Sequence, residues 1–209
     1  MAEQYLSAFA VDADALDRAV GSRDEGVVRA ALAVLPELAS AERLLRATDA
    51  GEVEAALTEI VTGRLDAGRP GGYTWLLELL GPALGTPLGA AVLPGRGWHR
   101  LDTAFRAWDL PTLATLWGRP WPFPWGGTAP DPFPWPFPAL APPSELDRLR
   151  AELAAFDTDR VDQDHALLPH GDEDDAEEVV WLLDDLLPAW TEGARTAGTA
   201  LLLLRDGGQ

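Results

Sequence analysis

The 209-residue sequence contains no cysteine, no lysine and no asparagine, and Ile60 is its single isoleucine. Without cysteine there is no thiolate zinc site, iron–sulfur cluster or cysteine nucleophile. Without lysine the chain cannot form the Schiff base of a usual pyridoxal phosphate enzyme or place a Walker lysine on a phosphate. A cysteine-free chain also fits a reducing compartment. We therefore expect a cytoplasmic protein that holds no cofactor.

Long apolar runs are also missing. Purely aliphatic runs, such as that from Ala200 to Leu204, are far shorter than the roughly 20 residues of a membrane helix. No basic segment followed by an apolar run opens the chain, so a secretory signal is not expected. The 16 arginines face 34 acidic residues, for a net charge of -18. Such acidity argues against binding to phosphates, so we expect neither a membrane nor a nucleic acid as partner.

The charge is unevenly distributed. Residues 145–192 contain 16 acidic residues and three arginines, whereas residues 93–122 contain four arginines and two aspartates. An acidic stretch of this kind is typical of a solvated helix surface, and it also fits a basic protein partner. Both interpretations remain open at the level of the sequence.

The pattern of side chains predicts a mostly helical α+β domain spanning residues 1–209. Alternation from Gln4 to Val11 predicts a strand, and the leucine run after Gly198 predicts a second strand. About seven helices are expected to pack on a small sheet that includes these N- and C-terminal strands. An isolated pair of strands is marginal, so the helices must cover it.

Several residues predict where the helices begin and end. Asp12, Ser22 (in the capping-box form S-x-x-E), residues 49–52 and Ser144 are predicted to open helices. Pro36 suits the first turn of a separate helix. Pro188 is expected to kink or break the last long helix.

Three segments carry a resemblance to a known family. They are YLSAFAVDADALDRAVGSRDE at the start, GGYTWLLELLGPALG in the middle and GTALLLLR near the end. With them the chain resembles a family of small acidic proteins, common in actinobacteria, that is catalogued as a domain of unknown function. The resemblance implies the same order of elements, with a strand at each end, and it implies no activity.

Residues 118–143 form a segment rich in tryptophan, phenylalanine and proline, which we predict to be a loop. Its halves, PWPFPW and PFPWPF, are near mirror images around Gly126 and Gly127. Proline fixes φ, so an aromatic wall built from this segment would be preorganised for a ligand. Packing of the rings onto the helices is the alternative. The predicted ligand-binding residues are Trp98, Trp117, Trp121, Phe123, Trp125, Phe133 and Trp135.

Two further groups of polar residues are candidate sites. His99 and Asp102 lie one helical turn apart, next to Arg100 and Arg106, so they suit acid–base work on an anionic substrate. His165, His170, Asp172 and Asp175 combine imidazole and carboxylate groups that could bind a hard metal ion, although their spacing matches no metal motif. Acidic residues also gather at helix N-termini for electrostatic reasons alone, so the sequence favours no metal there.

These patterns favour a non-enzymatic binding protein whose aromatic and proline-walled groove takes an apolar small molecule or a peptide segment. One alternative is a cofactor-independent or metal-assisted biosynthetic enzyme, such as a cyclase or isomerase, that uses His99, Asp102 and arginine in the same cavity. Another is an acidic immunity-type protein whose 145–192 surface binds a basic partner.

Overall fold

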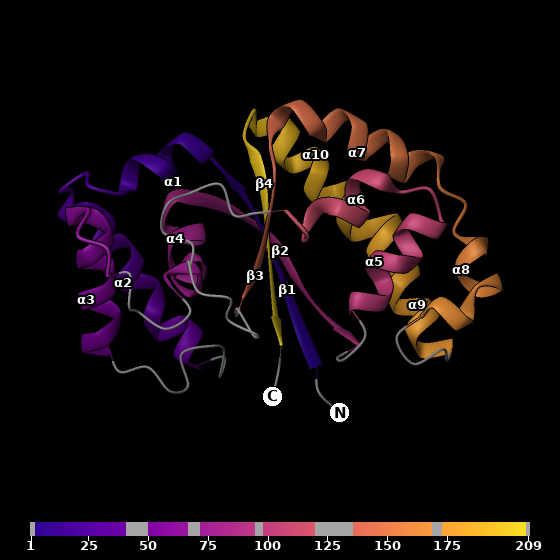
Figure 1. The fold of residues 1–209 in the computed structure, drawn as a ribbon, viewed down its shortest axis with the longest axis horizontal. Coiled ribbons are helices and arrows are strands. Elements are labelled where there is room, and N and C mark those ends of the chain that lie inside the picture. Colours follow the sequence, from indigo (N-terminus) through magenta and orange to yellow (C-terminus); the bar gives the residue numbers. More distant parts are fainter. Residues whose placement is uncertain are drawn as a thin grey trace.

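A computed structural model describes residues 3–40, 50–66, 72–94, 98–119, 136–168 and 173–207, with the backbone alone at residues 3–4, 39–40, 93–94, 98–100 and 206–207. Strands and helices alternate irregularly along this part of the chain (Figure 1). The elements are β1 (Glu3–Val11), α1 (Ala13–Ala19), α2 (Glu25–Ser40), α3 (Ala50–Thr62), the 3-10 turn η2 (Thr74–Leu76), α4 (Leu77–Leu84), β2 (Gly85–Pro94), α5 (Trp98–Ala107), α6 (Pro111–Leu116), β3 (Phe137–Ala141), α7 (Pro143–Ala155), α8 (Asp159–Gln163), the 3-10 turn η3 (His165–Leu167), α9 (Glu173–Trp181), the π segment η4 (Leu182–Leu186), α10 (Leu187–Ala197) and β4 (Ala200–Gly207).

The strands form an antiparallel sheet in the order β2-β1-β4-β3. The two strands predicted from the sequence, β1 and β4, are neighbours at its centre, paired from Gln4 with Gly207 to Val11 with Ala200. This confirms the mostly helical α+β fold and the pairing of the terminal strands. The outer strands β2 and β3 were not predicted, and β3 occupies residues that the sequence assigned to the Trp/Pro-rich loop.

Helices cover both faces of the sheet. In Figure 1 the sheet is seen edge-on, with α1–α4 on one side and α5–α10 on the other. In β4, Leu201 and Leu203 pack with the α5–α10 layer, whereas Leu202 and Leu204 pack with the α1–α4 layer. Because both faces of this central strand are buried, its sequence is a continuous leucine run rather than an alternation of apolar and polar residues.

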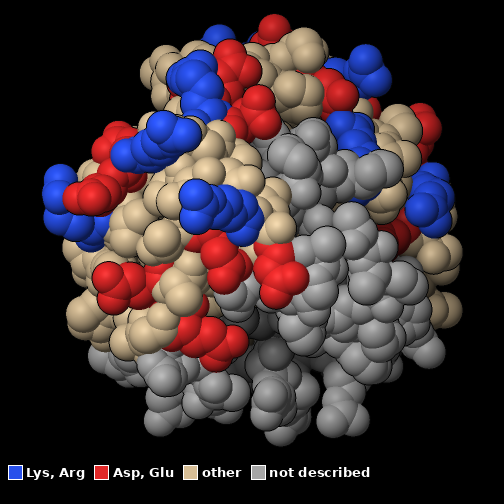
Figure 2. All heavy atoms as spheres, turned by 60° about the vertical axis from the view of Figure 1, so that its left-hand side comes forward, with Lys and Arg blue, Asp and Glu red and all other residues tan. Residues whose placement is uncertain are grey.

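The charged residues are unevenly distributed within one of the two layers. Residues 145–192, which hold the excess of acidic side chains, form α7–α10 and therefore belong to one layer only. On the side where α1–α4 come forward, arginine and acidic side chains are interspersed (Figure 2). Residues 98–119, where arginines outnumber aspartates, form α5 and α6 of the same layer as residues 145–192, so the contrast in charge along the sequence lies within the α5–α10 layer.

The observed N-termini of the helices agree only in part with those predicted from the sequence. Asp12 caps α1 as expected, because its Oδ1 accepts the N–H groups of Asp14 (2.9 Å) and Ala15 (3.2 Å). At α2 the cap is Asp24, whose Oδ1 accepts the N–H of Gly26, while Ser22 accepts the N–H of Asp24. The Ser22 capping box was therefore wrong by two residues.

The helix boundaries predicted at Pro36, Ser144 and Pro188 differ in how well they match the structure. Helix α2 runs through Pro36 instead of ending there, so residues 25–40 are one helix. Helix α7 begins at Pro143 with no side-chain cap, so the predicted cap at Ser144 was wrong. The break expected near Pro188 is confirmed, because the π segment Leu182–Leu186 interrupts the helix just before it. A proline lacks the N–H group that a regular helix needs, and its ring collides with the preceding turn. The wider turn of a π segment relieves this collision.

Within the described ranges, no helix combines the length and the apolar character that crossing a membrane requires.

Candidate functional site

The most unusual side chain in the core is that of Arg205 on β4. Arg205 is 8% exposed, whereas arginine is mostly exposed in proteins. Leu201, Leu203 and Arg205 occupy alternate positions, so the arginine side chain points toward the α5–α10 layer. In the sheet register, Arg205 lies between Leu6 of β1 and Phe137 of β3.

Two aromatic rings contact the guanidinium group of Arg205. Its central carbon lies 4.7 Å from the ring centroid of Phe137 and 5.6 Å from that of Trp117. At these distances the negative face of an aromatic ring attracts a cation. Trp117 follows the end of α6 and directly precedes the Trp/Pro-rich segment, whereas Phe137 begins β3 within that segment. Arg205 therefore contacts one ring before the segment and one ring in its second half.

The environment of Arg205 disfavours its charge. Burial lowers the pKa of the Arg205 guanidinium from its ordinary value to about 10, and the negative charge of Asp102 on α5 acts in the opposite direction. The largest effect is the loss of hydration, which the neighbouring carboxylate does not fully offset. At neutral pH the fold therefore holds a positive charge against apolar walls.

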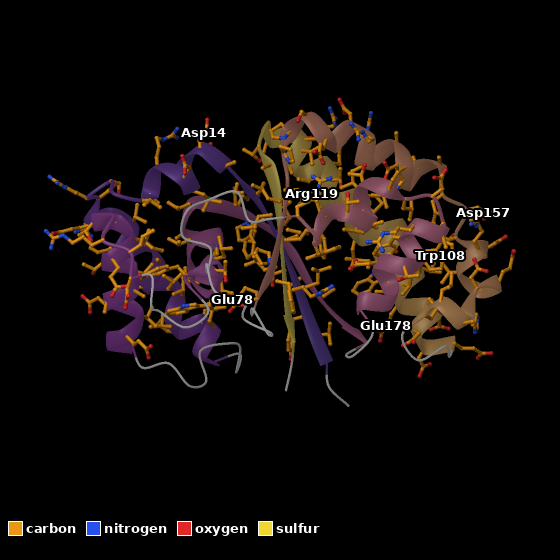
Figure 3. The ribbon with its side chains drawn as sticks, in the orientation of Figure 1. Asp14, Glu78, Trp108, Arg119, Asp157 and Glu178 are labelled. Carbon is orange, nitrogen blue, oxygen red and sulfur yellow. The ribbon has the colours of Figure 1, made fainter. Side chains whose placement is uncertain are left out.

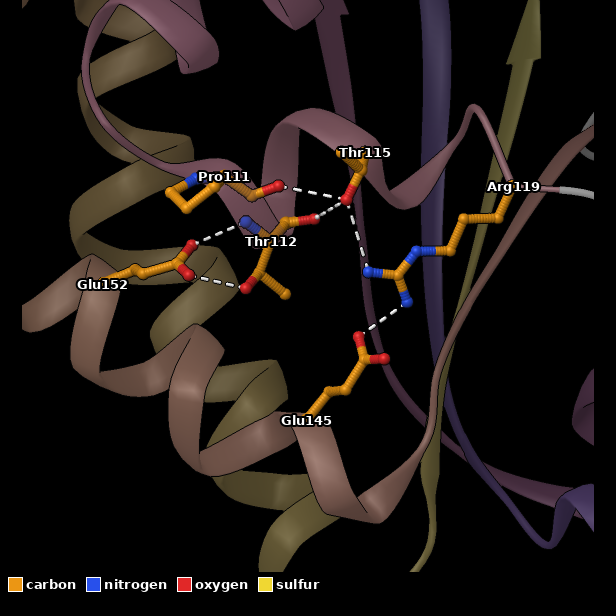
Figure 4. Close-up of polar contacts among 6 residues, drawn as sticks. All are labelled: Pro111, Thr112, Thr115, Arg119, Glu145 and Glu152. Atoms are coloured by element: carbon orange, nitrogen blue, oxygen red, sulfur yellow. Dashed lines mark hydrogen bonds and ion pairs between the residues drawn. The ribbon is translucent and has the colours of Figure 1, made fainter.

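Polar contacts fix the end of α6, from which Trp117 extends. One nitrogen of Arg119 donates to Glu145 Oε2 of α7 (2.6 Å), and the other donates to the hydroxyl of Thr115 (3.3 Å) (Figure 4). In the same view, Glu152 of α7 accepts from the backbone N–H and the hydroxyl of Thr112 (Figure 4). Helix α7 thus holds both ends of the short helix α6, and with it the position of Trp117.

A second polar contact secures α5, which carries Asp102. Trp108 lies deep in the α5–α10 layer (Figure 3) and donates from Nε1 to Asp164 Oδ2 at 2.9 Å. Arg160 donates to the carbonyl groups of Trp108 (3.3 Å) and Ala107 (3.0 Å) at the end of α5. The last carbonyl groups of a helix have no hydrogen-bond donor within that helix. The connection around α8 therefore holds the end of α5 in place.

The structure brings only some of the predicted site residues together. Trp117 and Asp102 lie at Arg205, whereas Arg106 is exposed and its guanidinium is directed at the carbonyl of Ala114. The backbone of Trp98, His99 and Arg100 belongs to the first turn of α5, and their side chains are not described. Five predicted ligand-binding residues lie outside the described residues: Trp121, Phe123, Trp125, Phe133 and Trp135.

The proposed metal ligands are not assembled in the part of the chain that the structure describes. His165 lies in η3, and Asp175 is buried in the first turn of α9, while His170 and Asp172 lie outside the described residues. Among the described side chains, no three histidine, aspartate or glutamate residues are grouped as a metal ion would require. Acidic residues in the first turn of α9 interact favourably with the positive end of the helix dipole.

Sequence reasoning missed Arg205 as a site residue. Its signal was present, because a charged residue follows directly on a leucine run that was predicted to be a buried strand. Strand alternation would have placed it on the same face as Leu201 and Leu203.

A comparison with protein families finds one match over almost the whole chain. The family is described as a domain of unknown function (DUF7691), and it matches residues 2–204. No curated protein and no solved structure matches the chain.

Proposed function

The chain belongs to the DUF7691 family, whose function is unknown, and we propose that it is a non-enzymatic cytoplasmic binding protein. Its ligand is an apolar small molecule or a peptide segment, held beside Trp117 and Phe137 in the region of the Trp/Pro-rich segment. The observation that supports this proposal is the buried guanidinium of Arg205 beside the rings of Trp117 and Phe137.

The geometry favours binding because it fixes aromatic surface in place. Trp117 and Phe137 are each half-buried, so part of each ring remains accessible beside the sheet. Trp117 is held by the contacts of α6 with α7, and Phe137 by its pairing with β4. Rings that are already ordered lose little conformational freedom when a ligand packs on them. The sequence predicts that Trp121, Phe123, Trp125, Phe133 and Trp135 extend the same apolar wall.

The chemistry of this group also favours binding over catalysis. Arg205 stays protonated at neutral pH with its pKa of about 10, so it cannot accept a proton as a general base there. Phenylalanine and tryptophan rings supply neither a nucleophile nor an acid. Together these side chains can orient a ligand and exclude water from it.

A neutral fluorescent dye tests the proposal without involving charge. Nile red becomes brighter in apolar surroundings, and titration into the purified protein should give a saturable increase with one site per chain. The Trp117→Leu variant should bind the dye at least about tenfold more weakly, because removing one large ring from a binding site costs more than about 1.4 kcal/mol. Trp181→Leu is the matched control, since Trp181 is 42% exposed on α9.

Circular dichroism first establishes that both variants are folded. Equal dye affinity in the wild type and Trp117→Leu would place the apolar site elsewhere and overturn the proposal. So would the absence of any saturable increase in the wild type. Loss of affinity in Trp117→Leu with retention in Trp181→Leu supports the proposed position.

A further inference from the structure

Strand β2 forms an edge of the sheet that the described part of the chain leaves open. In the order β2-β1-β4-β3 it pairs only with β1, and no other strand of the described ranges lies along its outer side. Strand β3, at the opposite edge, has no exposed residue. By contrast, the exposed residues of β2 are Thr86, Pro87, Gly89, Ala90 and Val92. The edge at β2 is therefore the more accessible of the two.

The middle of β2 exposes its backbone and small side chains. Gly89 is exposed, and a Cβ added to it would lie 2.7 Å from Nε1 of Trp190, so the exposed surface of Gly89 is backbone that Trp190 does not cover. Val92, which is 44% exposed, is one of the two large apolar residues exposed in the described chain. Ala90 lies between them and is also exposed. Another strand can approach such a surface closely.

Much of β2 lacks the features that protect an edge strand. Natural proteins usually protect an open edge with charged residues, proline or a bulge, because its backbone groups are a template for pairing with another chain. Pro87, and a shift in the register of β2 opposite Ala8 and Phe9, protect the first part of β2 in this way. Residues 89–93 contain neither a proline nor a charged residue. This second part of β2 is therefore suited to pair with a further strand.

Charge indicates which strand fits. The chain is 24% charged residues with a net charge of -18, yet residues 85–94 contain no charged residue. A basic peptide would find no carboxylate on β2 to pair with. Two copies of an acidic chain repel each other where their charged surfaces meet, so an uncharged strand is a place where they can approach. The uncharged strand that matches β2 is β2 of another copy.

We infer that β2 pairs with β2 of a second copy around a two-fold axis, so that the two sheets join into one continuous sheet. Two identical antiparallel strands form a self-complementary contact, which is the commonest arrangement in protein dimers. The stretch without proline or bulge, residues 89–93, has Ala91 at its centre. Pairing centred on Ala91 places Ala90 opposite Val92 of the second copy, and both exposed side chains become covered. This contact is separate from the proposed ligand site, because β2 and β3 lie at opposite edges of the sheet.

Sedimentation velocity of the purified full chain tests for the dimer. A short strand pair makes a small interface, so association should be weak, and the dimer fraction should rise between about 10 μM and about 1 mM protein. It should rise further at about 0.5 M salt, because salt screens the repulsion between two acidic copies.

A charge placed on β2 then assigns the dimer to this edge. Val92→Glu introduces a carboxylate beside the two-fold axis on each copy, and like charges across paired strands are destabilising, so the dissociation constant should rise at least about tenfold. Ala55→Glu is the matched control, because it adds the same charge at an exposed position of α3, away from β2 (Figure 1), and it should dimerise like the wild type. Circular dichroism establishes that both variants are folded.

Single cysteines report the register, because the chain contains no cysteine of its own. In an oxidised mixture of Ala90→Cys and Val92→Cys, the two thiols lie on directly opposed residues, whose Cα atoms are roughly 5 Å apart and so within the range of a disulfide. The mixed disulfide should therefore form faster than the disulfide of either variant with itself. Ala55→Cys on α3 is the control and should remain uncrosslinked under the same conditions.

Three results would overturn the inference. A wild-type chain that stays monomeric at every protein and salt concentration leaves the edge to a different partner. A dimer that Val92→Glu weakens no more than Ala55→Glu does uses another surface. A mixed disulfide that forms no faster than the Ala55→Cys dimer contradicts the pairing of β2 with itself. Concentration-dependent dimerisation that Val92→Glu alone weakens, with rapid formation of the mixed disulfide, supports it.

Discussion

The carboxylate of Glu152 on α7 accepts two hydrogen bonds from Thr112 on α6, one from the backbone N–H at 2.9 Å and one from the hydroxyl at 2.5 Å (Figure 4). Helix α6 has no side-chain cap of its own, since its N-cap residue is Leu110. Glu152 therefore supplies from a neighbouring helix the acceptor that a capping serine or aspartate would supply locally. This contact also fixes the helix that carries Trp117 at its end.

Removal of this acceptor is expected to destabilise the protein. In Glu152→Ala the buried Thr112 loses both acceptors, so the free energy of unfolding should fall by about 1 to 3 kcal/mol, measured by urea denaturation. Asp147→Ala is the control on the same helix, because the Asp147 side chain is 79% exposed, and its effect should stay within about 0.5 kcal/mol. Equal effects of the two substitutions would contradict the capping role of Glu152.

The indole of Trp108 is expected to contribute more to stability than any exposed tryptophan. It is 1% exposed, packs against Phe156 at 5.5 Å between ring centroids, and donates to Asp164. Trp108→Phe removes that donor and leaves a void, so thermal or chemical denaturation should show a loss of about 2 to 4 kcal/mol. Trp181→Phe should change stability by no more than about 0.5 kcal/mol, since Trp181 is 42% exposed and the substitution keeps an aromatic ring. A larger loss in Trp181→Phe than in Trp108→Phe would refute this ranking.

Gly198 ends α10 in a left-handed conformation that favours glycine. Its φ is 68°, and a Cβ added there would have no atom within 4 Å. The cost of Gly198→Ala is therefore one of backbone strain alone, about 1 to 2 kcal/mol by chemical denaturation. Gly118→Ala is the comparison, because a Cβ at Gly118 would make an ordinary contact of 3.7 Å with the carbonyl of Thr115. If the two substitutions cost the same, strain at Gly198 is not the cause.

The exposed ion pair between Glu192 and Arg195 on α10 should be visible in a pH titration. Hydrogen bonds from Arg195 lower the pKa of the Glu192 carboxyl from 4.5 to about 2. A lowered folded-state pKa means that the stabilisation is fully present above pH 4.5 and is lost as the pH falls toward 2. Carbon-detected NMR should give a midpoint for Glu192 well below 4.5, and Arg195→Gln should return it toward that value. A midpoint that is the same in both proteins would show that Arg195 is not responsible.

The elements that the sequence predicted best are those whose signals are local. Strand alternation in β1, the leucine run of β4 and the cap at Asp12 each depend on neighbouring residues, and the structure has all three. Pro188 also acts locally, through its missing N–H. The predicted cap at Ser22 was wrong because Asp24, two residues later, is an equally good cap and directly precedes α2.

The outer strands escaped prediction because their sequences are not typical of strands. Strand β2 contains Pro87 and Gly89, and β3 contains Pro138. An edge strand pairs on one side only, so it tolerates a residue that cannot donate a hydrogen bond. Gly89 is required by tertiary contact, because a Cβ there would lie 2.7 Å from Nε1 of Trp190. Neither reason is visible until the partner strand and the covering helix are in place.

Of the residues gathered at Arg205, Trp117 and Asp102 were candidates from the sequence, whereas Phe137 and Arg205 itself were not. Trp117 and the proline-rich segment stood out by composition, and Asp102 by its spacing from His99. Arg205 becomes notable only when β3 and the end of α6 are brought against β4, from positions distant in the sequence. The charged centre of the site is thus a product of topology rather than of a motif.

The strand order has a consequence for how the protein is made. Strand β4, at the centre of the sheet, follows all other described elements in the chain, and it pairs with β1 and β3 (Figure 1). Until the ribosome has released residues 200–207, neither helical layer has the leucine side chains that complete its core. The sheet and both core layers can therefore be completed only after translation of β4, while the pairing of β1 with β2 involves strands that are made earlier.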